Sequence, residues 1–136
     1  MILDTCFLIS LENSEKEAVE KSIILEAEEE DIRRPYVVIS ELYVGVGKGD
    51  YTERNRKRAE QVLKKYDFIE ATPDIMRTAG EYEGQIQRQG DDNNDKGIGL
   101  GDVIIGATAV HTGEALVTEN VSDFEKIPDD IEIESY

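Results

Sequence analysis

The sequence is poor in cysteine and in long apolar runs, and both shortages exclude classes of protein. Its 136 residues include a single Cys, so a disulfide framework and a Cys-based zinc cluster are ruled out. Every apolar run is far shorter than the roughly 20 residues that a membrane-spanning helix needs. The amino-terminal residues also lack the basic region of a signal peptide. We therefore expect a cytoplasmic domain in a reducing compartment.

Basic residues are scarce as well. The chain has 15 Lys and Arg against 31 Asp and Glu, which gives a formal net charge of −16. Such a charge repels nucleic acids and acidic membranes at low ionic strength. At molar salt the Debye length falls to about 3 Å, so the long-range repulsion is screened. We therefore hypothesise a halophilic host, and a simple gain in solubility is the alternative explanation.

Short apolar segments alternate with helical patterns along the whole chain. We expect strands at residues 2–3, 36–38, 68–69, 115–117 and 131–133, and helices that begin near residues 14, 40, 53, 73 and 102. Strands separated by helices predict an α/β domain with a mainly parallel sheet. The length fits one domain, residues 1–136. Ligands of such sheets bind beyond the carboxyl ends of the strands.

Some of these elements have more specific signals. Ser14, followed by Glu17, predicts a capping box that opens a helix over 14–31. Val19, Ile23 and Ala27 are spaced by four residues, so we expect them to face the core. Residues 90–101 are polar and rich in glycine, and we expect a loop there. The helix that follows is apolar on nearly every side and should therefore be buried.

Acidic and polar side chains stand next to several of the apolar segments. The candidate site residues are Asp4, Glu41 and Asp102, together with Thr118, Asn120 and Asp123 after the strand at 115–117. A carboxylate that is partly withdrawn from water is costly unless a cation pairs with it. Hard oxygen ligands suit Mg²⁺ or Mn²⁺. The pattern therefore favours a divalent-metal site, while the simpler alternative is that Asp4 and Asp102 only cap helices.

Four segments of the chain occur in an order and spacing that point to a known family. They are ILDTCFLI at the amino terminus, VVISELYVGV near residue 40, GLGDVIIGATAV near residue 100 and LVTENVSDF near residue 120. Together they resemble the PIN-domain family, and most closely its VapC-type toxin ribonucleases. The resemblance implies a three-layer α/β/α sandwich around a mainly parallel central sheet. It also implies an endoribonuclease that uses Mg²⁺ or Mn²⁺.

The resemblance further implies roles for individual residues. The metal-binding acids would be Asp4, Glu41 and Asp102. Many members have an acid where this chain has Asn120, so Asp123 would be the fourth catalytic carboxylate. A metal-activated water would attack the phosphodiester and leave a 5′-phosphate and a 3′-hydroxyl. The Thr118 hydroxyl would orient a carboxylate or bind phosphate.

The resemblance also implies partners, namely RNA, a cognate antitoxin protein and a second copy of the chain in a homodimer. The expected role is the toxin of a type II toxin–antitoxin pair. Because of Asn120, a catalytically impaired PIN-like interaction module is the alternative.

The helix at 53–66 carries a dense cluster of positive charge of the kind that RNA binding would need. Six of the fifteen basic residues fall between positions 54 and 65, and Arg54 and Arg58 share one helical face. This face is either a patch that contacts phosphates or a solvated surface paired with Glu53 and Glu60.

Other interpretations of the same acids match the sequence less well. Asp91, Asn93, Asp95 and Asp102 fit positions 1, 3, 5 and 12 of an EF-hand calcium loop, but Lys96 occupies position 6, where glycine is required. An Asp-nucleophile phosphatase would need a second Asp where Cys6 stands. We expect Cys6 to be a small buried hydrophobic residue.

Overall fold

Five parallel strands form one sheet in the computed structural model, which describes residues 1–28, 31–93 and 97–136. The strands are β1 (Ile2–Leu3), β2 (Arg33–Pro35), β3 (Asp67–Ile69), β4 (Leu116–Val117) and β5 (Ile133–Glu134). Their order is β3-β2-β1-β4-β5, and every neighbouring pair is parallel. The predicted α/β class with a parallel sheet is therefore confirmed.

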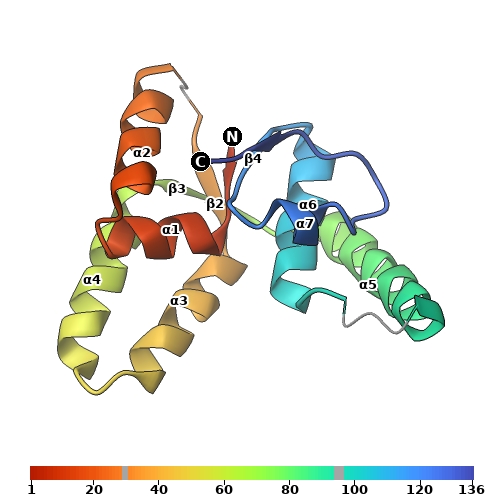
Figure 1. Ribbon diagram of the computed structural model, residues 1–136, viewed down its shortest axis with the longest axis horizontal. Helices are drawn as coiled ribbons and strands as arrows, with labels where there is room; N and C mark the ends of the chain where they lie inside the picture. Colours follow the sequence, from red (N-terminus) through yellow and green to blue (C-terminus); the bar gives the residue numbers. More distant parts are fainter. Residues whose placement is uncertain (29–30, 94–96) are drawn as a thin grey trace.

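Helices cover both faces of this sheet (Figure 1). On one side lie α1 (Thr5–Glu12), α2 (Lys16–Glu28), α3 (Val37–Lys48) and α4 (Thr52–Lys65), and on the other lie α5 (Pro73–Asn93), α6 (Leu100–Thr112) and α7 (Val121–Phe124). This is the expected three-layer sandwich. The chain places β2 and β3 on one side of β1 and then returns to place β4 on its other side. The strand order thus reverses between β1 and β4, which is where α/β sheets commonly bind ligands.

The core is built around α6, as its composition predicted. All seven residues from Val103 to Ala109 are buried. Strands β1 and β4 are fully buried beside it. On α5, four residues that recur at helical spacing form the buried face: Ile75, Ala79, Tyr82 and Ile86. No helix in the described ranges is long and apolar enough to cross a membrane.

The apolar run after Pro35 forms the start of α3 instead of the predicted strand at 36–38. The strand lies just before it, at Arg33–Pro35. A short apolar run fits a buried helix as well as a strand, so its hydrophobicity alone does not distinguish the two. Helix α3 also starts earlier than predicted and continues through Gly45 and Gly47 to Lys48.

Strand β2 contains an arginine that the sequence pattern does not mark as a core residue. The Arg34 side chain is 2% exposed. Its guanidinium carbon lies 3.3 Å from the centre of the Phe68 ring, and Phe68 is its register partner on β3. This cation–π contact offsets part of the cost of removing the charge from water.

Helix α2 differs from the prediction in its start and in the face that it buries. It begins at Lys16, because Ser14 has a positive φ of 57° and belongs to the turn that ends α1. Its buried residues are Ala18, Ser22 and Leu25. The predicted core residue Ile23 is instead 63% exposed. The predicted helix end falls partly on residues 29–30, which lie outside the described ranges.

The loop predicted at 90–101 is shorter than expected. Helix α5 continues to Asn93, and α6 begins at Leu100. Asp91 and Asn93 therefore lie in a helix, which is incompatible with the start of an EF-hand loop. Asp95 and Lys96 lie outside the described residues. Helices α1 and α7 were not predicted at all.

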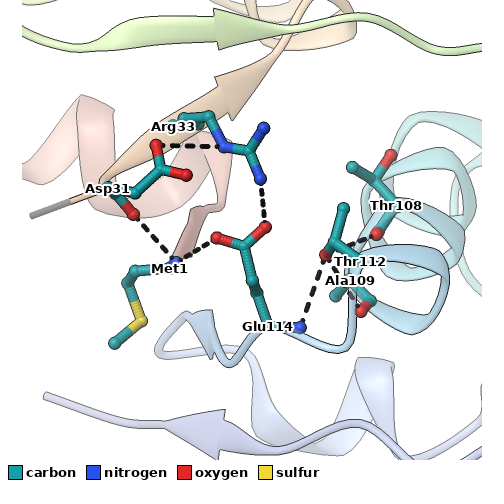
Figure 2. A network of polar contacts seen from close by, with 7 residues as sticks. All are labelled: Met1, Asp31, Arg33, Thr108, Ala109, Thr112 and Glu114. Atoms are coloured by element: carbon teal, nitrogen blue, oxygen red, sulfur yellow. Dashed lines mark hydrogen bonds and ion pairs between the residues drawn. The ribbon is translucent and has the colours of Figure 1, made fainter.

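The amino ends of the strands are held by a network of ion pairs (Figure 2). Glu114, just before β4, accepts a 2.6 Å hydrogen bond from the Met1 ammonium and pairs with Arg33 at the start of β2. Burial acts to raise the pKa of Glu114, but these two hydrogen bonds outweigh it and hold the pKa below its ordinary value. This network stabilises the edge of the sheet opposite to the carboxyl ends of the strands.

Candidate active site

Asp4 lies at the carboxyl end of the central strand and is held by three hydrogen bonds. Its side chain is 1% exposed. One carboxylate oxygen accepts from the Thr5 backbone N–H at 2.7 Å. The other accepts from the Thr118 hydroxyl at 2.7 Å and from the Cys6 thiol at 2.9 Å. Asp4 does cap α1, as the simpler alternative supposed, but its second oxygen is held by groups outside the cap.

Glu41 reaches the same place from α3. It stands in the second turn of this helix, because α3 begins at Val37 and not near residue 40 as predicted. Its carboxylate accepts a 2.8 Å hydrogen bond from the Thr5 hydroxyl. Burial raises the pKa of Glu41, the Thr5 hydrogen bond acts in the opposite direction, and the negative charge of Asp4 raises the pKa further.

Asp102 completes the cluster from the first turn of α6. Burial raises its pKa to about 7, and the charges of Asp4, Glu41 and Asp123 add to the increase in that order. The capping position of α6 is Gly99, not Asp102, so helix capping does not explain this aspartate. The carboxylates predicted to converge are therefore close enough to repel one another.

The polar residues after β4 occupy different places. Thr118 is fully buried, and its hydroxyl donates to Asp4. Asn120 is exposed, and its backbone N–H donates to the Thr118 hydroxyl at 3.0 Å. Asp123, on α7, is the acid from this segment that raises the pKa of Asp102.

Two residues of the cluster were missed by sequence reasoning. Thr5 holds Glu41, and Cys6, predicted to be a buried hydrophobic residue, is partly exposed and donates to Asp4. Burial, the charge of Asp4 and this hydrogen bond raise the pKa of the Cys6 thiol to about 11. The available signal was their position, because the first turn of a helix that is capped by Asp4 stays close to the cap.

The two arginines predicted to contact RNA have different surroundings. Arg54 is exposed on α4. Arg58 donates to the Glu12 carbonyl oxygen at 2.8 Å and to Asn13 Oδ1 at 3.0 Å, so it joins α4 to the end of α1.

A groove of about 370 Å³ lies between α1, α3 and α4, and Glu41 is the member of the cluster that lines it. Its lining includes Glu41 and Arg58, together with the aliphatic side chains of Ile9 and Val44, which are 41% and 55% exposed. A molecule that fills this groove would contact Glu41 directly.

The cluster has the chemistry of a site for a hydrated cation. None of the ion pairs formed by the described residues includes Asp4, Glu41 or Asp102. Within the same ranges, no group of three or more His, Cys, Asp or Glu side chains is arranged so that it could hold a metal ion by itself. Mg²⁺ commonly binds through one or two carboxylates and keeps several waters. Carboxylate oxygens are ligands of the type that Mg²⁺ and Mn²⁺ prefer, so Asp4, Glu41 and Asp102 are the residues that could hold such an ion together with waters.

The fold and the cluster define an α/β protein with a group of acidic side chains near the topological switch point of its sheet. The family model described as PIN domain matches residues 1–130. The chain belongs to the PIN domain family.

Individual relatives are similar over nearly the whole chain. Ribonuclease VapC2 of Rickettsia felis is 25% identical over 127 residues, which cover 93% of this chain and 91% of that protein. The crystal structure of VapBC2 from Rickettsia felis bound to a DNA fragment from its promoter has a TM-score of 0.75 at 23% identity, over 98% of this chain and 96% of that chain. A toxin–antitoxin complex from Klebsiella pneumoniae has a TM-score of 0.67 at 26% identity, over 93% and 92% of the two chains.

Proposed function

We propose that this protein is a metal-dependent endoribonuclease that hydrolyses RNA phosphodiesters at the carboxylate pocket. The observation that carries the proposal is that Asp4 and Glu41 both accept hydrogen bonds from Thr5, while the Glu41 carboxylate lies against Gly101, the neighbour of Asp102. Burial and the charges of Asp4 and Glu41 raise the pKa of Asp102 to about 7. A pocket of this kind disfavours its own charge and is therefore prepared for a cation. Membership of the PIN domain family and the relative named as a ribonuclease support the reaction class.

Asp4 and Asp102 would hold the cation, with Glu41 beside them. A bound Mg²⁺ or Mn²⁺ would supply Lewis-acid activation of a water molecule and neutralise charge on the phosphate oxygens. Asp102 would lose its proton when the cation binds, because metal ligands must be deprotonated. Thr118 and Cys6 fix one Asp4 oxygen by donating to it.

Attack by water on phosphorus, with the 3′ oxygen as the leaving group, would give a 5′-phosphate and a 3′-hydroxyl. Asp123 is near enough to influence Asp102, so it supplies a fourth carboxylate although Asn120 is not an acid. This arrangement favours an active nuclease over a catalytically impaired interaction module.

The test is cleavage of single-stranded RNA by purified protein with Mn²⁺ or Mg²⁺, beside Asp4→Asn and Asp102→Asn. We expect metal-dependent cleavage by the wild type only, with 5′-phosphate ends on the products. The exposed surface variant Asp130→Asn is the matched control and should remain active. Full activity in either site variant would refute the assignment, and an inactive wild type that still folds would favour the impaired module.

We further propose that the protein acts in the cytoplasm as the toxin of a type II pair and that a cognate antitoxin fills the groove between α1, α3 and α4. The solved complexes of similar chains support a protein partner. Val44 and Ile9 give the groove an exposed aliphatic lining. Because Glu41 also lines the groove, a bound antitoxin would block access to the pocket.

The antitoxin proposal is tested by co-expression with any short reading frame found next to this gene. Val44→Asp should break the complex, whereas Met76→Asp, on the opposite helical layer and 44% exposed, should not. Equal binding by both variants would place the partner elsewhere. Light scattering of the free chain tests the expected homodimer.

A further inference from the structure

We propose that Gly101 is a positioning residue, which leaves room for the Glu41 carboxylate at the start of α6. The inference rests on the proposed function, in which Glu41 serves a bound cation. A Cβ atom at position 101 would lie 2.9 Å from Glu41 Cδ and Oε1 and 3.0 Å from Oε2. Carbon atoms in favourable contact are about 3.5–4.0 Å apart. An alanine at position 101 would therefore occupy space that the Glu41 carboxylate needs.

The helix itself has no need of a glycine at this position. Among the described glycines only Gly97 and Gly113 have a positive φ, so the Gly101 backbone is open to any residue. Glycine within a helix is less stable than alanine, because it loses more conformational freedom on folding. In Gly106, on the same helix, a Cβ would instead meet the core residue Ile127. At Gly101 the three nearest obstructing atoms all belong to Glu41.

Thr5 holds Glu41 from another direction. The Thr5 side chain is 6% exposed, and its hydroxyl donates to Glu41 Oε1 at 2.8 Å. The carboxylate is therefore fixed between a hydroxyl of α1 and the first turn of α6. The positive end of the α6 dipole also favours a negative group there. A methyl group at position 101 would turn the end of Glu41 away and weaken its hydrogen bond to Thr5.

The first experiment compares Gly101→Ala with Gly84→Ala in the whole protein. Gly84 is also helical, and no atom lies within 4 Å of the place that its added methyl group would take, so it reports the helical preference alone. We expect Gly101→Ala to weaken Mn²⁺ binding by about 10-fold or more, which is the usual effect of losing a residue that orients a metal ligand. The affinity is measured by electron paramagnetic resonance of the free ion. Gly84→Ala should bind Mn²⁺ as the wild type does.

The second experiment separates a positional effect from a general loss of structure. In the metal-free Glu41→Ala background the obstruction is absent, so Gly101→Ala should raise the melting temperature, as Gly84→Ala does. In the Gly101→Ala background, Glu41→Asp shortens the acid by one methylene and should restore part of the Mn²⁺ affinity. The same Glu41→Asp change should lower the affinity of the wild type.

The outcomes distinguish this inference from the proposed function. If the wild type binds Mn²⁺ and Gly101→Ala binds it equally well, Gly101 has no positioning role. Independent, additive effects of the changes at positions 101 and 41 would overturn it as well, because residues in contact should be coupled. If the folded wild type binds no Mn²⁺ and cleaves no RNA, the proposed function itself fails.

Discussion

Replacing Asp102 by Asn removes a carboxylate whose negative charge is disfavoured by its surroundings in the folded protein. Burial raises the pKa of Asp102 from its ordinary value of 3.8 to about 7, and three neighbouring carboxylates add to the increase. Above this pKa the folded, metal-free protein carries a charge that the unfolded chain solvates more easily. The substitution should therefore abolish catalysis and at the same time stabilise the metal-free fold.

The sign and size of the effect follow from linkage between protonation and folding. Because the pKa of Asp102 is raised in the folded state, its charge does not reduce the free energy of unfolding below about pH 4. The reduction grows as the pH rises and is complete above about pH 7. A shift of roughly three pKa units corresponds to about 4 kcal/mol, at about 1.36 kcal/mol per unit. Solvent screening at this partly exposed position and the lost interaction with the helix dipole both reduce the gain. We expect about 1 to 3 kcal/mol after these reductions, which is a sizeable share of the roughly 5–15 kcal/mol that stabilises a typical domain.

The assay is urea unfolding of wild type and Asp102→Asn in the presence of a chelator, at about pH 8 and about pH 5. At the lower pH much of the wild-type carboxyl is already protonated in the folded state, so the gain should fall to less than half of its value at pH 8. Added Mn²⁺ should then stabilise the wild type more than the variant. A ligand raises stability by binding the folded state, and the variant lacks the Asp102 carboxylate and should bind Mn²⁺ more weakly.

Asp130→Asn is the control for this prediction, because it makes the same chemical change on an exposed side chain. It should leave the free energy of unfolding almost unchanged at both pH values. No stabilisation by Asp102→Asn, or an equal gain at pH 5 and pH 8, would refute the electrostatic account of the pocket.

Three further predictions concern the surroundings of the site and the surface. Thr118→Val removes a donor 2.7 Å from Asp4 and should lower Mn²⁺ affinity and cleavage about 10- to 100-fold, while Thr118→Ser should retain both; equal loss in the two variants would argue against a role for the hydroxyl. Glu114→Gln should cost about 1–3 kcal/mol near pH 7 in urea unfolding. Because the folded pKa of Glu114 is lowered, this cost should disappear as the pH falls below its ordinary range, and a cost that persists in acid would contradict the ion-pair account. The melting temperature should rise with KCl up to about 1 M, as screening relieves the repulsion from a net charge of −16, and a melting temperature that is highest at low salt would count against the halophilic hypothesis.

Much of the fold was predictable because residues that face the core recur as apolar residues at a regular spacing in the sequence. The all-apolar helix after Asp102, the inward stripe of α5 and the alternation of strands and helices were each recognisable, and the structure has them. The prediction was wrong where the spacing of apolar residues fits more than one element or more than one helical face. The run 36–39 is apolar enough for a strand or a helix, and α2 carries apolar residues on two faces, of which the core takes the one with Leu25.

The candidate acids were predictable for a related reason. A carboxylate beside an apolar segment is withdrawn from water by the fold, and that cost is visible in the sequence. The residues that donate hydrogen bonds to these acids were not predictable in the same way. Thr118 and Asp4 are 114 residues apart, and the Thr5 hydroxyl reaches Glu41 across 36 residues. No local pattern records that such pairs will meet.

By itself, the sequence determined which segments are apolar enough to leave water, and hence the class of fold and the acids that stand beside those segments. Only the tertiary structure decided which groups meet at the carboxyl ends of β1 and β4: a threonine and a cysteine that orient Asp4, and a glycine without which Glu41 would lack space. The physical reason is that burial depends on the composition of each segment, whereas contact geometry depends on how distant segments pack.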